Sequence, residues 1–151
     1  MTLPRTLPLL LICLLIPVSG EPAAQPSVPE LKARKAELET KAAKNKDDWK
    51  TGFKLRFVTE LIKALEEKKY DSDFCRYQMR CLGTAAEMES TKNNHHYPGK
   101  MTRLVSSYFD VLPTCPSGAA YTYKMILKPR DEYDITCPTH GYTYNTLAGF
   151  R

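Results

Sequence analysis

Residues 115–137 read CPSGAAYTYKMILKPRDEYDITC, and this stretch decides the fold. Two runs rich in aromatic and apolar residues, Tyr121–Leu127 and Tyr133–Cys137, flank a turn-forming Lys-Pro-Arg-Asp sequence. The pattern predicts two strands joined by a turn. A cysteine followed by proline stands at each end, at Cys115 and Cys137, so both cysteines lie at the base of the predicted hairpin.

A two-stranded hairpin is marginally stable by itself in water, so further support is expected. A disulfide between Cys115 and Cys137 would close its base, adding about 3 kcal/mol in the chain-entropy model. A third short strand is predicted at residues 142–144. The rest of the chain would then pack on this unit, which predicts an α+β fold with N-terminal amphipathic helices on a small antiparallel sheet.

The N-terminus has the organisation of a secretory signal peptide. A short start with one basic residue, Arg5, precedes the almost wholly apolar run Leu7–Val18 and the small residues that end at Gly20. That run is shorter than the roughly 20 apolar residues that a transmembrane helix needs. We therefore expect a secreted or periplasmic protein without a membrane span after cleavage, organised as a signal peptide (1–20), a flexible tether (21–29) and a single helix-plus-sheet domain (30–151).

Three helices are predicted before the hairpin. Residues 30–46 are good helix formers with few apolar positions, so we expect an exposed and weakly docked helix. From Trp49 to Leu65 an apolar residue recurs every four positions, which predicts an amphipathic helix with a buried face. A third helix follows the capping sequence at 71–73 and contains Gly83, which is favourable there only if close packing excludes a side chain. A short helix is expected within 101–109, and the C-terminal residues 148–151 are expected to be loose.

The net charge of +5 is concentrated near the N-terminus. Residues 30–70 hold twelve Lys or Arg against eight Asp or Glu. Because both signs are interspersed, this segment is typical of solvated helix faces. We expect no nucleic-acid partner for an exported chain with so small a basic excess.

Beyond the signal peptide the chain has four cysteines: Cys75, Cys81, Cys115 and Cys137. An even number in an exported chain indicates disulfides, but four cysteines allow three pairings and the sequence does not choose among them. Cys75 and Cys81 can pair only if Cys75 precedes the third helix, because a regular helix separates them by about 9 Å along its axis. Otherwise Cys75 needs a partner elsewhere.

An ordered series of short motifs runs from Cys75 to Gly141. The series comprises Leu82-Gly-Thr-Ala-Ala-Glu-Met, Asn93-Asn94, Tyr97-Pro98, Leu104 with Tyr108, Leu112-Pro-Thr-Cys-Pro and Tyr121-Thr-Tyr. It resembles the globular part of type IV pilin-like proteins, which include the major pseudopilins of type II secretion. The basic leader and membrane helix of that family have no counterpart here. Lys50-Thr-Gly-Phe imitates the leader cleavage site, but Phe57 stands where the family has Glu.

The resemblance implies a pilin-like domain with 30–70 as a helical lead and 71–151 as the pilin-like part. It implies an exported, non-enzymatic interaction protein whose partners are filament, secretion or envelope components. Some pseudopilins carry calcium in a C-terminal loop, where this chain has Asp131, Glu132 and Asp134. Three acids in a turn are usually solvated, so we expect no cofactor there.

The alternative function is an exported Cys/His metal-binding module. The candidate zinc ligands are Cys75, Cys81, Cys115, Cys137 and His140, among which Cys115, Cys137 and His140 form the principal alternative set. Cys137-x-x-His140 has ligand-like spacing, but Cys115-Pro116 offers no second close pair. Export therefore favours disulfides over zinc. The sequence contains no phosphate-binding loop, nucleophile elbow or metalloprotease motif, so we expect no enzyme and name no catalytic residue.

Overall fold

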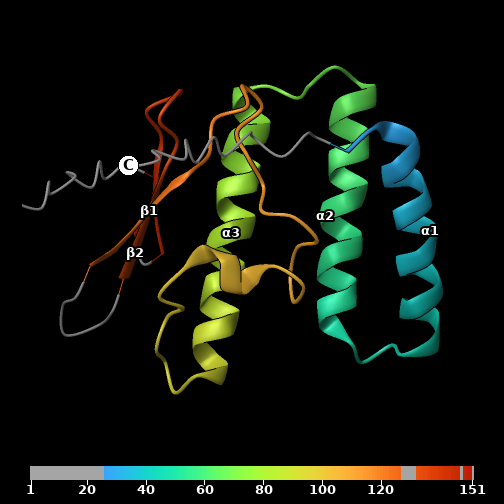
Figure 1. Cartoon of the computed structure of the whole chain (residues 1–151), viewed down its shortest axis with the longest axis horizontal. Coiled ribbons are helices and arrows are strands. Elements are labelled where there is room, and N and C mark those ends of the chain that lie inside the picture. Colours follow the sequence, from blue (N-terminus) through green and yellow to red (C-terminus); the bar gives the residue numbers. More distant parts are fainter. Residues whose placement is uncertain (1–25, 127–131, 147, 151) are drawn as a thin grey trace, which may run out of the picture.

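The computed structural model describes residues 26–126, 132–146 and 148–150. The predicted signal peptide at 1–20, most of the tether and Asp131 therefore lie outside the described residues. Three helices lie side by side: α1 (Val28–Lys44), α2 (Trp49–Glu66) and α3 (Ser72–Lys92) (Figure 1). A four-stranded antiparallel sheet packs beside α3, which confirms the α+β class and the small antiparallel sheet.

Polar residues cap all three helices, and the cap at Asp71 was predicted from the sequence. Asp71 accepts hydrogen bonds from the first backbone N–H groups of α3, and Asp48 does the same for α2. Ser27 and Glu30 form a reciprocal capping box at the start of α1. These side chains satisfy N–H groups that have no partner within the helix, so each helix begins at a defined residue.

The prediction that the first helix docks weakly is wrong. Leu31 and Leu38 of α1 are only 5% and 1% exposed, and α1 packs along α2. The two leucines are seven residues apart, so they lie on one face two turns apart. Arg34, between them, forms a bidentate ion pair with Asp110, at 2.6 and 2.7 Å. Two well-placed leucines and this ion pair are enough to dock an otherwise polar helix.

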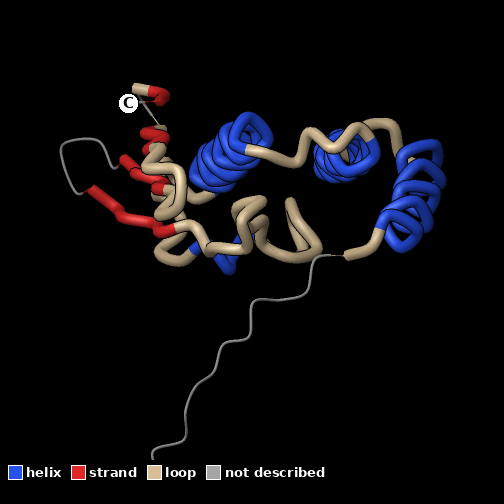
Figure 2. Tube along the Cα trace, turned by 90° about the horizontal axis from the view of Figure 1, so that it is seen from above, coloured by secondary structure: helices blue, strands red, loops and turns tan. Residues whose placement is uncertain are grey.

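The core lies between α2, α3 and the sheet. The predicted apolar face of α2 is buried at Phe57, Val58, Leu61 and Ile62, whereas Trp49 at its start is 41% exposed. Figure 2 shows the three helices in a row, with the strands beyond α3 and the connecting segment 93–121 along one side of the row. In that segment the 3-10 helix η1 (Met101–Leu104) takes the place of the longer helix expected within 101–109.

The sheet has the order β1-β2-β3-β4. Strand β1 (Thr122–Ile126) pairs with β2 (Glu132–Thr136), and β2 pairs with β3 (Thr143–Asn145), which confirms the three predicted strands. The expectation of a loose C-terminus is wrong, because β4 (Gly149–Phe150) pairs with β3.

Close packing, the condition under which Gly83 is favourable in α3, is present between this helix and the sheet. A Cβ at this position would lie 2.2 Å from Cε1 of Tyr144 in β3. The glycine therefore lets the helix approach the strand, which explains a residue that is otherwise unfavourable inside a helix.

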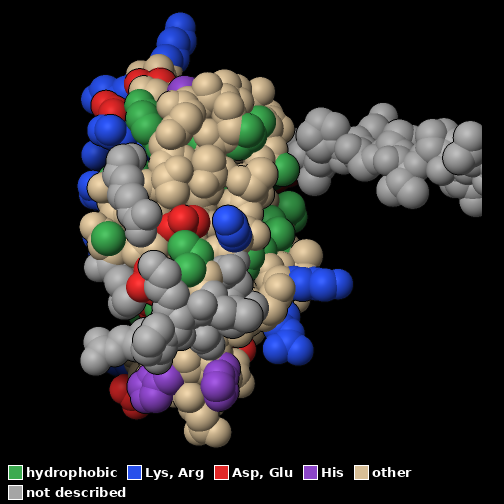
Figure 3. All heavy atoms as spheres, turned by 90° about the vertical axis from the view of Figure 1, so that its left-hand side faces the viewer, with side chains coloured by type: hydrophobic (Ala, Val, Ile, Leu, Met, Phe, Trp, Pro, Cys, Tyr) green, Lys and Arg blue, Asp and Glu red, His purple; other side chains and the backbone are tan. Residues whose placement is uncertain are grey.

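The surface on the sheet side mixes side chains of all classes. Figure 3 shows several Lys and Arg side chains along the left margin of this face and others at its right, with acidic, apolar and histidine side chains interspersed. Within the described residues, no helix combines the length and apolar character needed to cross a membrane.

Candidate metal centre

Three cysteines and one histidine meet at the junction of α3 and the sheet. Cys75 comes from the first turns of α3, Cys115 from the segment that precedes β1, and Cys137 and His140 from the turn after β2. Their ligand atoms, three Sγ and one ring nitrogen, all lie within 4.8 Å of one another. All three cysteines are 0% exposed and the histidine is half-buried.

A tight turn positions Cys115. The backbone N–H of Gly118 donates to the carbonyl of Cys115 at 2.7 Å, and the N–H of Cys115 donates to the carbonyl of Ala119 at 2.9 Å. Gly118 has φ +88°, a conformation that glycine adopts without steric cost. The Ser117 hydroxyl donates a hydrogen bond to Cys115 Sγ at 3.0 Å.

A second tight turn holds Cys137 and His140. The N–H of Gly141, which has φ +67°, donates to the carbonyl of Cys137 at 3.0 Å. The backbone N–H of His140 points at Cys137 Sγ, 3.4 Å away. Hydrogen bonds from backbone N–H groups to sulfur stabilise thiolates. Each of the two Cys-Pro sequences therefore forms a glycine-closed turn that presents its sulfur to the same point.

The distances within the cluster fit a tetrahedral zinc ion. Cys115 Sγ and Cys137 Sγ lie 3.3 and 3.5 Å from His140 Nδ1. Bonds of ordinary length to one zinc ion at tetrahedral angles place sulfur and nitrogen ligands about 3.6 Å apart and two sulfurs about 3.8 Å apart. These two separations are therefore close to those that a shared ion would impose, and the remaining pairs of ligand atoms lie within 4.8 Å.

The thiols of the cluster differ in their acidity. Burial raises the pKa of the Cys75 thiol to about 12. Burial by itself would also raise the pKa of Cys115. Hydrogen bonds from Ser117 and the neighbouring thiols outweigh this effect and hold the pKa of Cys115 below its ordinary value. A divalent cation bound at the cluster would favour ionisation of its thiols.

The predicted disulfides are not formed. Cys75, Cys81, Cys115 and Cys137 are all free thiols in the structure. Cys75 and Cys81 both belong to the regular helix α3. They cannot form a disulfide with each other, because a regular helix separates them by about 9 Å along its axis. Cys115 and Cys137 do come together as the sequence suggested, but Cys75 and His140 join them.

Cys75 was one of five candidate ligands in the sequence, but the principal set of Cys115, Cys137 and His140 did not include it. Its signal was indirect: a cysteine that cannot reach Cys81 within one helix needs another partner. Cys81 lies outside the cluster, where burial raises the pKa of its thiol to about 11. It provides an internal reference, since it shares a helix with Cys75 but contacts none of the other ligands.

A second layer of hydrogen bonds surrounds the cluster. The Tyr121 hydroxyl lies 3.4 Å from Cys75 Sγ and donates to Gln78 Oε1 at 2.8 Å. Gln78 Nε2 in turn lies 3.5 Å from the Tyr70 hydroxyl. Such outer partners orient metal ligands and contribute to metal affinity.

The acidic residues near the hairpin turn form a separate arrangement. Glu132 Oε2 and Asp134 Oδ1 both accept hydrogen bonds from the buried Asn145 amide, at 3.1 and 2.8 Å. Asp131, the third acid considered for calcium, lies outside the described residues.

Comparison with known proteins adds no evidence about this metal centre beyond its geometry. No family model, no curated protein and no solved structure matches the chain.

Proposed function

We propose that the protein is a zinc-binding protein that holds one Zn²⁺ ion through Cys75, Cys115, Cys137 and His140. The observation that carries the proposal is the convergence of four nitrogen and sulfur ligand atoms, from three separate segments, within 4.8 Å. Because the set supplies four protein ligands, it leaves no position for substrate. Closed sets of this kind are structural, whereas catalytic zinc sites keep a position open.

The donor atoms select the metal. Thiolate and imidazole ligands suit zinc, whereas calcium and magnesium prefer oxygen. A bound ion would tie the start of α3 to both ends of the hairpin, at Cys115 and Cys137. It would thus provide the cross-link that the sequence analysis assigned to a disulfide. Cys115 and Cys137 cannot form that disulfide and bind zinc at the same time.

The metal content of purified protein tests the proposal. Protein prepared without chelator should contain one zinc per chain, and the thiols of Cys75, Cys115 and Cys137 should become titratable only after denaturation and chelation. Cys75→Ser should lose most of the zinc. Cys81→Ser, which changes the same atom type in the same helix, should keep it.

Substitution with Co²⁺ adds a readout that does not depend on zinc retention during purification. Thiolate-to-cobalt absorption should appear in the wild type and in Cys81→Ser, and it should weaken in Cys75→Ser. Metal-free protein in which peptide mapping under non-reducing conditions finds Cys115 linked to Cys137 would refute the proposal.

We also propose that the metal-stabilised domain acts as an exported, non-enzymatic interaction protein of the pilin-like kind. The support for this role is the signal-peptide pattern, the ordered motifs between Cys75 and Gly141, and the packing of one long helix, α3, against an antiparallel sheet. The expected partners are filament, secretion or envelope components. Cross-linking in cells should capture such a component, and recovery of the monomer alone would count against this role.

A further inference from the structure

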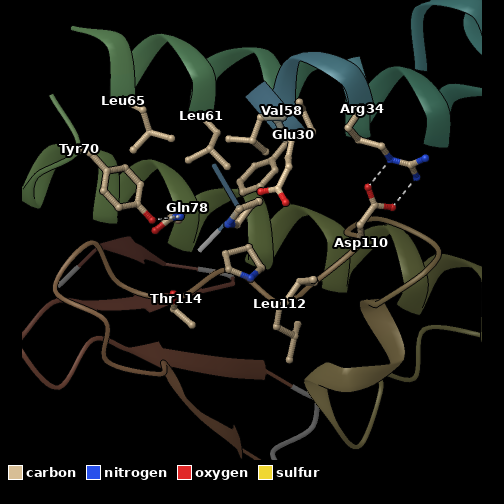
Figure 4. Close-up of a pocket in the computed structure, with 15 residues that line it drawn as sticks. Glu30, Arg34, Val58, Leu61, Leu65, Tyr70, Gln78, Asp110, Leu112 and Thr114 are labelled. Carbon is tan, nitrogen blue, oxygen red and sulfur yellow. Dashed lines mark hydrogen bonds and ion pairs between the residues drawn. The ribbon is translucent and has the colours of Figure 1, made fainter. Parts of the chain in front are cut away.

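A cavity of about 280 Å³ opens between α1, α2 and the segment that follows η1. Its walls are largely apolar, as the close-up in Figure 4 shows for the side chains of α2 and the facing loop. The apolar lining residues are Leu31, Phe57, Val58, Leu61, Leu65, Val111, Leu112 and Pro113. Val111, in the lining, is 58% exposed, although large apolar side chains elsewhere in the described chain are mostly covered. Apolar surface left in water favours uptake of an apolar ligand.

The charged side chains of the cavity already have partners. Arg34 is engaged by Asp110 in a bidentate pair and also pairs with Glu37. The Glu30 carboxylate accepts hydrogen bonds from the N–H and hydroxyl of Ser27, each at 2.7 Å. The lining therefore offers no available cation for an anionic ligand, and its two carboxylates would repel one.

One buried polar group faces the cavity from α3. Gln78 is 2% exposed, and its Oε1 is engaged by Tyr121. Its Nε2 carries two hydrogens, but the one contact recorded for it within the described part is the 3.5 Å approach to the Tyr70 hydroxyl. An amide N–H in a buried position has a strong requirement for an acceptor. The cavity thus combines apolar walls with a buried amide donor, Gln78 Nε2.

We infer that this cavity binds a small, uncharged, mostly apolar molecule that carries one hydrogen-bond acceptor, such as an alcohol or a carbonyl compound with a short hydrocarbon chain. The hydrocarbon lies against Leu61, Val58 and Leu112, and the oxygen accepts from Gln78. Ligand sites commonly have this composition, with apolar walls and few polar groups that fix orientation. The inference does not depend on the metal centre.

Binding of the neutral fluorescent probe N-phenyl-1-naphthylamine to the purified protein tests the cavity itself. The wild type should bind it saturably with one site per chain. Leu61→Phe, which fills the cavity, should weaken binding at least tenfold. Lys63→Phe places the same side chain at an exposed position of α2 and should bind as the wild type does. Thermal unfolding of both variants verifies that they are folded.

Displacement of the probe tests the chemistry of the ligand. 1-Octanol should displace it at a concentration at least tenfold lower than octanoate or octylammonium, because the cavity has no available charge partner. In Gln78→Leu, octanol should lose at least fivefold in affinity while toluene, which has no hydrogen-bonding group, should displace the probe as before. Equal binding of the probe by Leu61→Phe and wild type, or displacement by octanoate at concentrations as low as octanol, would overturn the inference.

Discussion

Removal of Zn²⁺ should lower the thermal stability of the protein by a large and specific amount. The four ligands come from α3, the segment before β1 and the turn after β2, so the site exists only in the folded chain. Binding to the folded state alone stabilises by RT ln(1 + [Zn²⁺]/Kd). At free Zn²⁺ 1,000-fold above Kd, this amounts to about 4 kcal/mol. For a domain of this size, that corresponds to a rise in Tm of about 12–20 °C.

Circular dichroism of the helices during heating measures this difference. One sample is saturated with buffered Zn²⁺ and a matched sample is stripped by a chelator, at equal protein concentration and under reducing conditions. The Tm of the wild type should depend on the logarithm of free Zn²⁺. Cys81→Ser should show the same dependence, because its sulfur is outside the cluster, whereas Cys75→Ser should lose most of it.

Two outcomes would show that the reasoning is wrong. The first is a wild-type Tm that is equal, within about 2 °C, in the saturated and stripped samples. The second is an equal loss of zinc dependence in Cys75→Ser and Cys81→Ser, since general disturbance of α3 would then explain the effect. In samples prepared without reductant, an intact disulfide between Cys115 and Cys137 would produce the first outcome together with a loss of Tm on reduction.

Three further predictions concern stability, measured by denaturant unfolding. Gly83→Ala should destabilise by about 1–3 kcal/mol, despite alanine's better helix propensity, because its Cβ would meet the Tyr144 ring at 2.2 Å; a more stable variant would contradict the close packing. Leu38→Ala should cost about 2–5 kcal/mol, because that side chain is 1% exposed, whereas a loosely docked α1 would lose far less. Asp110→Asn should cost up to about 1 kcal/mol at neutral pH, because hydrogen bonds from Arg34 outweigh the opposing effect of burial and hold the pKa of Asp110 below its ordinary 3.8. A lowered folded-state pKa adds stability above the unfolded-state pKa, so the difference from wild type should vanish as pH falls below 3.8, and a difference independent of pH would contradict the ion pair.

Local patterns in the sequence were sufficient for most of the secondary structure. Alternating aromatic and apolar residues identified the strands, and the four-residue recurrence from Trp49 identified α2 and its buried face. Asp71 marked the start of α3 because a capping side chain acts on N–H groups only two or three residues away. Each of these signals depends on neighbours in the chain, which is why it can be read without the fold.

Elements that depend on distant contacts were misjudged. Strand β4 has two residues, too few for any pattern, and it forms because β3 offers an unpaired edge. Helix α1 looked exposed because most of its residues are charged, but Leu31 and Leu38 find a complementary face on α2. Docking of this kind depends on the shape of the partner surface, which the helix's own sequence does not contain.

The stretch from Cys115 to Cys137 illustrates the same division at the candidate metal centre. The sequence by itself determined the hairpin, the Cys-Pro pair at each of its ends and the ligand-like spacing between Cys137 and His140, because turn chemistry is local. Only the tertiary structure decided that Cys75, some forty residues earlier, completes the set. Packing of α3 against the sheet carries that sulfur to the base of the hairpin, where three thiols and an imidazole meet. Sequence spacing cannot report such a meeting, because the distance between residues far apart in the chain is determined by how whole elements pack.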